Sequence, residues 1–168
     1  LNHIIKNQKI SEDYMSQKIK IGRKNIEIFF VRHHLSHASN VYFSNFNKSA
    51  ILTTDAFGEK ESSVFFSFKN NKISTISSQY FPHSLGSFYS TFTEFCGFKP
   101  QNEEWKLMGA SAYTKNNIIY KKIRSLIDFQ NNGKFQLDLN YFNHYQFHRP
   151  KYYNQNLVNF LGSEPNTK

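Results

Sequence analysis

Two histidines and an aspartate are the residues of this sequence best suited to carry chemistry. His33 and His37 lie four positions apart in the segment HHLSHA, and Asp55 follows in the segment TTDAFGE. If HHLSHA is helical, the two imidazoles fall on one face, one turn apart, and can converge on one cation. Asp55 would add a carboxylate oxygen. The spacing alone also fits a pair of hydrogen-bonded or partly exposed histidines.

Two apolar runs predict the strands that would carry these residues. Residues 27–31 are typical of a buried strand, which places His33 just beyond its carboxyl end. Residues 50–54 predict a second strand that ends on Asp55. Because ligands of open α/β sheets bind at the carboxyl edge, the two strand ends predict a metal cradle. Its open positions suit a catalytic or substrate-orienting metal better than a closed structural one.

The remaining pattern predicts a mixed α/β (α+β) fold, in which a β meander is flanked by helices. Asn70-Asn71 is a hairpin signal because asparagine tolerates positive φ. We expect a loop at residues 55–61, before the meander, and no regular element after residue 139. The predicted helices are residues 1–24, 34–43, 85–95, 103–113 and 116–128, and the predicted strands of the meander and beyond are 62–69, 72–80 and 134–139.

Two weaker signals accompany the metal motif. Gly58 permits close backbone approach, so neighbouring N–H groups could face a phosphate, but a single glycine is more often simply a turn residue. His144 and His148 repeat the four-residue spacing, yet Pro150 follows and no carboxylate partner is evident. We interpret this second pair as surface or packing histidines.

Composition narrows the class of protein. The 168-residue chain starts without a methionine and ends in a polar tail, which suggests a piece of a longer protein. Its single cysteine, Cys96, excludes an intrachain disulfide and a cysteine-based zinc site, and fits a reducing, cytoplasmic compartment. No signal peptide and no apolar stretch of about 20 residues is present. We therefore expect a soluble cytoplasmic protein with no membrane partner.

The net charge of +9 raises the hypothesis of a nucleic-acid-binding module. The basic residues are dispersed, however, and the abundance of Lys, Asn, Ile, Phe and Tyr is expected from an AT-rich genome. The charge remains compatible with anionic small ligands such as phosphates. Nucleic acid is therefore the less favoured partner.

Five segments, in order, resemble the amino-terminal domain of the carbamoyltransferases that include the nodulation-factor, tobramycin and cephamycin enzymes. The resemblance is strongest over residues 30–145. The family's loop usually reads DGxGE, so Ala56 stands where a glycine is usual. The segments are HHLSHA, DAFGE, FPHSLGSFYSTFTEFCGFKP, EWKLMGASAY and FQLDLNYF.

The resemblance implies that residues 1–168 are a fragment of one actin-like, ribonuclease-H-like ATPase domain. In such enzymes a second domain makes carbamoyladenylate from carbamoyl phosphate and ATP, and the actin-like domain passes the carbamoyl group to an acceptor hydroxyl. Carried over by motif, His33, His37 and Asp55 would hold a divalent metal. The family's metal is usually described as Fe(II), and Zn or Mn would also fit these donors. A further aspartate ligand is expected beyond Lys168.

The same motifs suggest residues for the remaining steps. His34 and His83 are candidates to accept the hydroxyl proton, and Lys106 is a candidate to pair with a phosphate or carboxylate. Gly58 and Glu59, with Gly109 of the segment EWKLMG, are the candidate contacts of ATP or carbamoyladenylate. Each of the three catalytic candidates could equally be structural or solvated.

Two functions follow from the resemblance. The first is part of an ATP- and metal-dependent O-carbamoyltransferase, whose partners are carbamoyl phosphate, ATP, a hydroxyl-bearing small-molecule acceptor and the remainder of the same enzyme. The alternative is a truncated, catalytically inactive remnant that binds metal or nucleotide. The acceptor, the identity of the metal and the oligomeric state are not determined by these residues.

Overall fold

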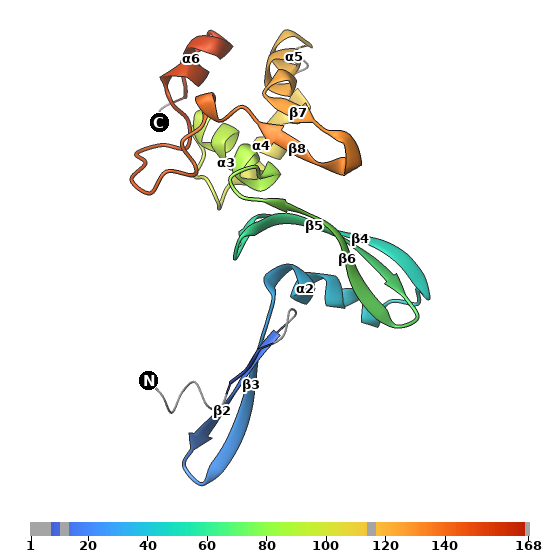
Figure 1. Cartoon of the computed structure of the whole chain (residues 1–168). Coiled ribbons are helices and arrows are strands. Elements are labelled where there is room, and N and C mark those ends of the chain that lie inside the picture. Colours follow the sequence, from blue (N-terminus) through green and yellow to red (C-terminus); the bar gives the residue numbers. More distant parts are fainter. Residues whose placement is uncertain (1–7, 11–13, 114–116, 167–168) are drawn as a thin grey trace. The chain divides into compact units, whose positions relative to one another are not determined.

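Three antiparallel sheets and a set of short helices make up the fold (Figure 1). A computed structural model describes residues 8–10, 14–113 and 117–166 of the chain. Within these residues the prediction of a mixed α/β fold is confirmed, and nothing conflicts with part of a ribonuclease-H-like domain. By its internal contacts the chain forms two compact units: residues 1–53 with 64–77, and residues 54–63 with 78–168.

The first sheet corrects the helix predicted for residues 1–24. Strands β1 (Gln8–Ile10), β2 (Tyr14–Ile21) and β3 (Lys24–Val31) form an antiparallel sheet in that order. In residues 14–21 the apolar Met15, Ile19 and Ile21 fall on alternate positions, with Ser16, Lys18 and Lys20 between them, which is a strand period rather than a helical one. Gly22, at φ 60°, makes the turn into β3. Residues 1–7 and 11–13 of the predicted helix lie outside the described residues.

Strand β3 is exposed, so the prediction of a buried strand at residues 27–31 is wrong for this chain. Its apolar side chains point to both faces of the sheet, as in strands that are covered on both sides. Phe29, Phe30 and Val31 nevertheless remain 56%, 50% and 47% exposed. The apolar pattern is that of a strand buried on both faces, but the described residues do not cover either face of β3.

Helix α2 (His33–Ala38) packs on the second sheet, which consists of β4 (Lys48–Gly58), β5 (Glu61–Lys69) and β6 (Lys72–Tyr80) (Figure 1). A 3₁₀ turn at Ser39–Phe43 continues the helix, as the sequence predicted for residues 34–43. The small core beneath it consists of Ala38, Val64 and Phe66, with Leu35, Ile51 and Ile73 packed against them. The contact holds α2 against β4.

Tight turns connect the strands of this meander. Asn70 and Asn71, at φ 52° and 56°, form the predicted hairpin turn between β5 and β6. The loop predicted at residues 55–61 is wrong, because β4 continues through Gly58 and only Glu59 and Lys60 form the turn into β5. Glu59, at φ 61°, takes the positive-φ position of this turn. Asp55 therefore lies inside a strand.

The second unit is built around an aromatic core. Helices α3 (Leu85–Phe95), α4 (Glu104–Ala110), α5 (Asn117–Ser125) and α6 (Gln155–Leu161) surround the small antiparallel sheet of β7 (Ile127–Phe129) and β8 (Phe135–Leu137). Short 3₁₀ turns lie at Ser111–Tyr113, Asn131–Gly133 and Leu139–Tyr141. The buried core residues are Phe92, Phe95, Leu126, Phe135, Leu137, Phe142, Tyr153, Leu157, Val158 and Leu161.

Helix α6 lies where the sequence predicted no regular element. Its amino end is capped by the Asn154 side chain, which accepts hydrogen bonds from the backbone N–H groups of Asn156 and Leu157. Gly162, at φ 72°, ends it in the left-handed conformation. Both signals were present in the sequence, so this miss reflects an unrecognised pair of caps.

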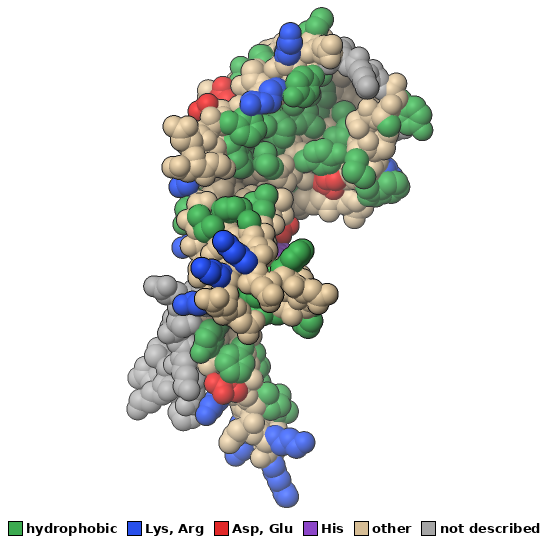
Figure 2. Space-filling model, turned by 90° about the vertical axis from the view of Figure 1, so that its right-hand side faces the viewer, with side chains coloured by type: hydrophobic (Ala, Val, Ile, Leu, Met, Phe, Trp, Pro, Cys, Tyr) green, Lys and Arg blue, Asp and Glu red, His purple; other side chains and the backbone are tan. Residues whose placement is uncertain are grey.

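Basic side chains gather at the tip of the hairpin formed by β2 and β3 (Figure 2). They include the exposed Lys20, Arg23 and Lys24. Charged side chains of this kind keep an open strand pair solvated and discourage edge-to-edge association. None of the helices in the described part of the chain is long and apolar enough to cross a membrane.

Candidate metal centre

Helix α2 brings the two predicted histidine ligands together. It begins at His33, immediately after β3, so His33 and His37 stand one turn apart on the same face. Their Nε2 atoms are 3.2 Å apart, and the rings meet edge to face with centroids 4.7 Å apart. Two nitrogens that bind one tetrahedral ion at about 2.0–2.1 Å lie about 3.3 Å apart. The observed separation therefore suits a shared cation.

The intervening histidine tethers the helix to β4. His34 is 2% exposed, and its Nδ1 lies 2.8 Å from the Thr53 hydroxyl. The same hydroxyl donates to the Val64 carbonyl at 3.4 Å, so both bonds are satisfied when His34 carries its proton on Nδ1. Thr53 was missed by the sequence analysis, because a threonine within a strand is unremarkable until its partner is known.

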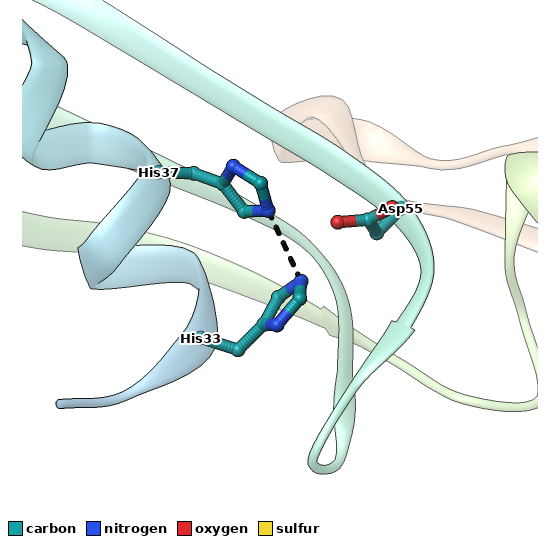
Figure 3. Close-up of side chains that lie close together, drawn as sticks. All are labelled: His33, His37 and Asp55. Carbon is teal, nitrogen blue, oxygen red and sulfur yellow. Dashed lines mark hydrogen bonds between the residues drawn. The ribbon is translucent and has the colours of Figure 1, made fainter. Parts of the chain in front are cut away.

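Asp55 completes the cluster. It lies two residues after Thr53 in β4, and alternate residues of a strand point to the same face. One ligand atom from each of His33, His37 and Asp55 lies within 4.8 Å of the others, and Figure 3 shows the carboxylate facing the two imidazoles. Asp55 is half-buried and His37 is exposed, which leaves the cluster accessible. The sequence prediction placed Asp55 at a strand end, whereas it projects from the strand interior.

This set of donors fits a divalent metal. Two imidazole nitrogens and one carboxylate oxygen form the set that non-haem Fe(II) sites use, and the same donors also bind Zn and Mn. Three protein ligands leave positions open for water or a substrate oxygen. The geometry thus suits an ion that contacts a reactant.

His83 is not a member of this cluster and belongs to the second unit. Its Nδ1 accepts a hydrogen bond from the backbone N–H of Leu137 at 3.1 Å, and its carbonyl accepts one from the Ser62 hydroxyl at 2.7 Å. Burial lowers the pKa of His83 from its usual value. In the neutral ring Nε2 then carries the proton, so this arrangement presents a donor rather than a proton acceptor.

Lys106 is paired within its own helix. Its Nζ donates to the Glu103 carboxylate and lies 5.5 Å from the centre of the Trp105 ring. The hydrogen bond from Lys106 lowers the pKa of Glu103. A phosphate would have to replace Glu103 as the partner of this lysine. Gly109, two turns into the segment, faces open space, since an added Cβ would meet no atom within 4 Å.

One of the two candidate nucleotide contacts near the β4–β5 turn, Glu59, lines a pocket. Gly58 is buried at the end of β4, and Glu59 begins the turn. Phe57, Glu59, Lys60 and Phe81 surround a volume of about 350 Å³. Apolar rings beside a lysine are compatible with a base and a phosphate, but the predicted contact of Gly58 itself with a ligand remains a prediction.

His144 is a packing residue, as the sequence analysis proposed, and His148 is exposed. His144 is 3% exposed, its Nε2 donates to the Pro82 carbonyl at 2.8 Å, and its Nδ1 is buried without a partner among the described residues. The pKa of His144 is lowered, mainly by burial. The charges of Arg149 and His83 lower it further, and the hydrogen bond to the Pro82 carbonyl acts in the opposite direction.

These two histidines predict an acid-sensitive second unit. Burial lowers the folded-state pKa values of His83 and His144. Below about pH 6.5 the unfolded chain therefore binds more protons than the folded chain, and the folded state loses stability as the pH falls. We expect the melting temperature to fall between pH 7.5 and pH 5.5 and to fall less in His144→Gln. Melting curves followed by circular dichroism test this, with the exposed His148→Gln as control. Equal pH slopes in all three proteins would contradict it.

The fold and the cluster together define a mixed α/β domain with a candidate two-histidine, one-carboxylate metal centre. The sequence model of the carbamoyltransferase N-terminus family matches residues 3–163, so the chain belongs to this family. The match covers the three candidate ligands and every helix and strand of the described residues.

Individual relatives agree with this assignment. An uncharacterised protein of Synechocystis sp. is 36% identical over 118 residues, which cover 70% of this chain and 19% of the relative. An uncharacterised protein of Methanocaldococcus jannaschii is 31% identical over 92 residues, covering 55% and 18%. The nodulation protein NolNO of Sinorhizobium fredii is 28% identical over 116 residues, covering 67% and 16%. The chain thus spans less than a fifth of the length of these relatives.

Proposed function

We propose that this chain is the metal-binding part of an ATP-dependent O-carbamoyltransferase. The observation that carries the proposal is the convergence of His33, His37 and Asp55 in a member of the carbamoyltransferase N-terminus family. Membership of the family supports carbamoyl transfer in general. The metal, the use of ATP and the carbamoyladenylate donor are the parts that need testing, as is the expectation that the chain is a fragment of one actin-like domain.

In the proposed reaction, carbamoyladenylate made from carbamoyl phosphate and ATP gives its carbamoyl group to a hydroxyl of a small-molecule acceptor. His33, His37 and Asp55 would hold a divalent metal, with Fe(II) first among the candidates, and sequence beyond Lys168 would add a further ligand. When bound, the metal would polarise a carbonyl or phosphate oxygen of the mixed anhydride and orient the hydroxyl.

The chain's other candidate residues would bind and orient the donor. Lys106 would release Glu103 to meet a phosphate, since its side chain is 38% exposed. Gly58, Glu59 and Gly109 would lie along the nucleotide. We assign His83 to holding β8, because its Nδ1 accepts a hydrogen bond from the backbone N–H of Leu137. We assign His34 to holding β4, because its buried ring is bonded to the Thr53 hydroxyl.

The alternative function is binding of metal or nucleotide without turnover. It is favoured by one observation: all three clustered ligands lie within a chain that spans less than a fifth of its relatives. These ligands would let the chain bind a cation in the absence of the rest of the enzyme.

Transfer of labelled carbamoyl phosphate by the native gene product separates the two functions. With ATP and a panel of hydroxyl acceptors, we expect label in the acceptor, loss of transfer on chelation, and recovery on adding Fe(II). The His37→Ala product should transfer at least about 100-fold more slowly, since a ligand is lost, while His148→Ala should match the wild type. Metal binding without any carbamoyl transfer would support the alternative. Transfer that is indifferent to chelation and to His37→Ala would overturn the metal-dependent mechanism.

A further inference from the structure

The backbone that carries Asp55 is held from behind by the start of helix α3. Ser84, the residue that caps this helix, is completely buried. Its hydroxyl donates to the Asp55 carbonyl at 3.1 Å and accepts from the backbone N–H of Ser87 at 3.1 Å. The Ser87 hydroxyl reaches the next carbonyl, that of Ala56, at 3.5 Å. The helix start and β4 are thus joined at two consecutive peptides.

Gly86 makes this approach possible. A Cβ built on Gly86 would lie 2.6 Å from the Ala56 nitrogen and 2.8 Å from the Asp55 carbonyl carbon. Both are backbone atoms of a strand, which cannot rotate away as the end of a long side chain can. The φ angle of Gly86 lies outside the positive range, so space rather than backbone conformation requires glycine here.

Helix α3 is a stiff support for this contact. Ser87, Ser90, Thr91, Phe92, Thr93 and Phe95 are all buried in it, and Phe92 and Phe95 belong to the aromatic core. A close-packed helix of this kind cannot retreat to admit a methyl group without disturbing the core. Any added atom at Gly86 must therefore move β4, and with it Asp55.

We propose that Ser84 and Gly86 are positioning residues for the metal centre, which set where the Asp55 carboxylate stands. The inference rests on the proposed metal site and deepens it. Neither residue offers a ligand atom to the cluster. They act through the backbone of β4, whereas His34 holds the same strand two residues earlier through Thr53. A displacement of well under 1 Å at a ligand is enough to weaken a site, because such sites depend on the residues behind their ligands.

Gly86→Ala and Gly109→Ala form a matched pair for the first test. Both add one methyl group to a helix, but only the methyl at position 86 meets other atoms within 4 Å. Titrating the native gene product, which would include the further ligand expected beyond Lys168, with Co²⁺ and following its visible absorption reports affinity and ligand geometry together. We expect Gly86→Ala to raise the dissociation constant at least about tenfold and to alter the band intensities. Because no nucleotide is present in this titration, Gly109→Ala should match the wild type in Co²⁺ affinity and spectrum.

Ser84→Ala and Asn154→Ala form the second pair. Each removes the side chain that caps a helix of the same unit, so each should cost similar stability. Only Ser84→Ala also removes a hydrogen bond to Asp55. We expect weaker Co²⁺ binding and a changed spectrum in Ser84→Ala alone, measured at a temperature where circular dichroism shows both variants folded.

Each outcome bears on one of the two ideas. If His37→Ala loses Co²⁺ while Gly86→Ala and Ser84→Ala bind it with wild-type affinity and spectrum, the positioning role is overturned and the metal site stands. If the wild type binds no Co²⁺, or His37→Ala binds it equally well, the metal site fails and the positioning role falls with it. If Gly86→Ala does not fold, the comparison of Ser84→Ala with Asn154→Ala decides.

Discussion

Replacing His37 with alanine is expected to weaken the binding of Co²⁺ or Fe²⁺ by the 168-residue chain at least about 100-fold, because one of three ligands disappears. Its Nε2 lies 3.2 Å from that of His33, and no other described His, Cys or Asp/Glu joins the cluster to replace it. Isothermal titration under anaerobic conditions measures the loss. Asp55→Ala should behave in the same way, since it removes the carboxylate oxygen.

The control for this result is His148→Ala, which removes an exposed imidazole from the same chain. It tests whether any surface histidine contributes to the measured affinity. Unchanged binding in His37→Ala and Asp55→Ala would contradict the metal centre. A steep dependence of nucleic-acid binding on salt, together with indifference to both substitutions, would instead revive the basic nucleic-acid-binding hypothesis.

The second large effect is expected in the core. Phe142 is completely buried, with its ring centre 5.7 Å from those of Phe88 and His144, and its backbone pairs with Tyr153. Phe142→Ala should lower the free energy of unfolding by about 3–5 kcal/mol, since it loses the buried ring and leaves a cavity. Urea denaturation followed by near-ultraviolet circular dichroism measures the change.

Phe147→Ala is the matched control, because its ring is 92% exposed. It should change the free energy of unfolding by no more than about 0.5 kcal/mol. A loss below about 1 kcal/mol in Phe142→Ala would show that the residues around position 142 do not form a close-packed core. The comparison therefore tests the second unit independently of any ligand.

The part of the site that could be predicted from sequence is the part that depends on local geometry. The spacing of His33 and His37 predicted a shared helix face because four residues make about one turn. The Asn70-Asn71 turn was predictable for a similar reason, since asparagine accepts positive φ. These inferences need only near neighbours in the chain.

The errors arose where several patterns compete. Residues 14–21 are rich in lysine and isoleucine, and we predicted them as part of a helix. Their two-residue period is that of a strand, and they pair with β3. The expected loop around Asp55 failed because Glu59 takes the positive-φ position of the turn and β4 runs on to Gly58. Strand ends are set by pairing with a neighbour, which composition does not specify.

The family, the candidate ligands and the mixed α/β class could be predicted from the amino-acid sequence, because motifs and periodicity are local properties of the chain. The folded structure was needed to show that His34 anchors α2 through Thr53, that Ser84 binds the Asp55 carbonyl, and that Gly86 leaves room for β4. Ser84 and Asp55 are 29 residues apart, and His34 and Thr53 are 19 apart. Contacts at such separations arise from the packing of whole elements, so the residues that hold the ligands in place become visible only when those elements are folded together.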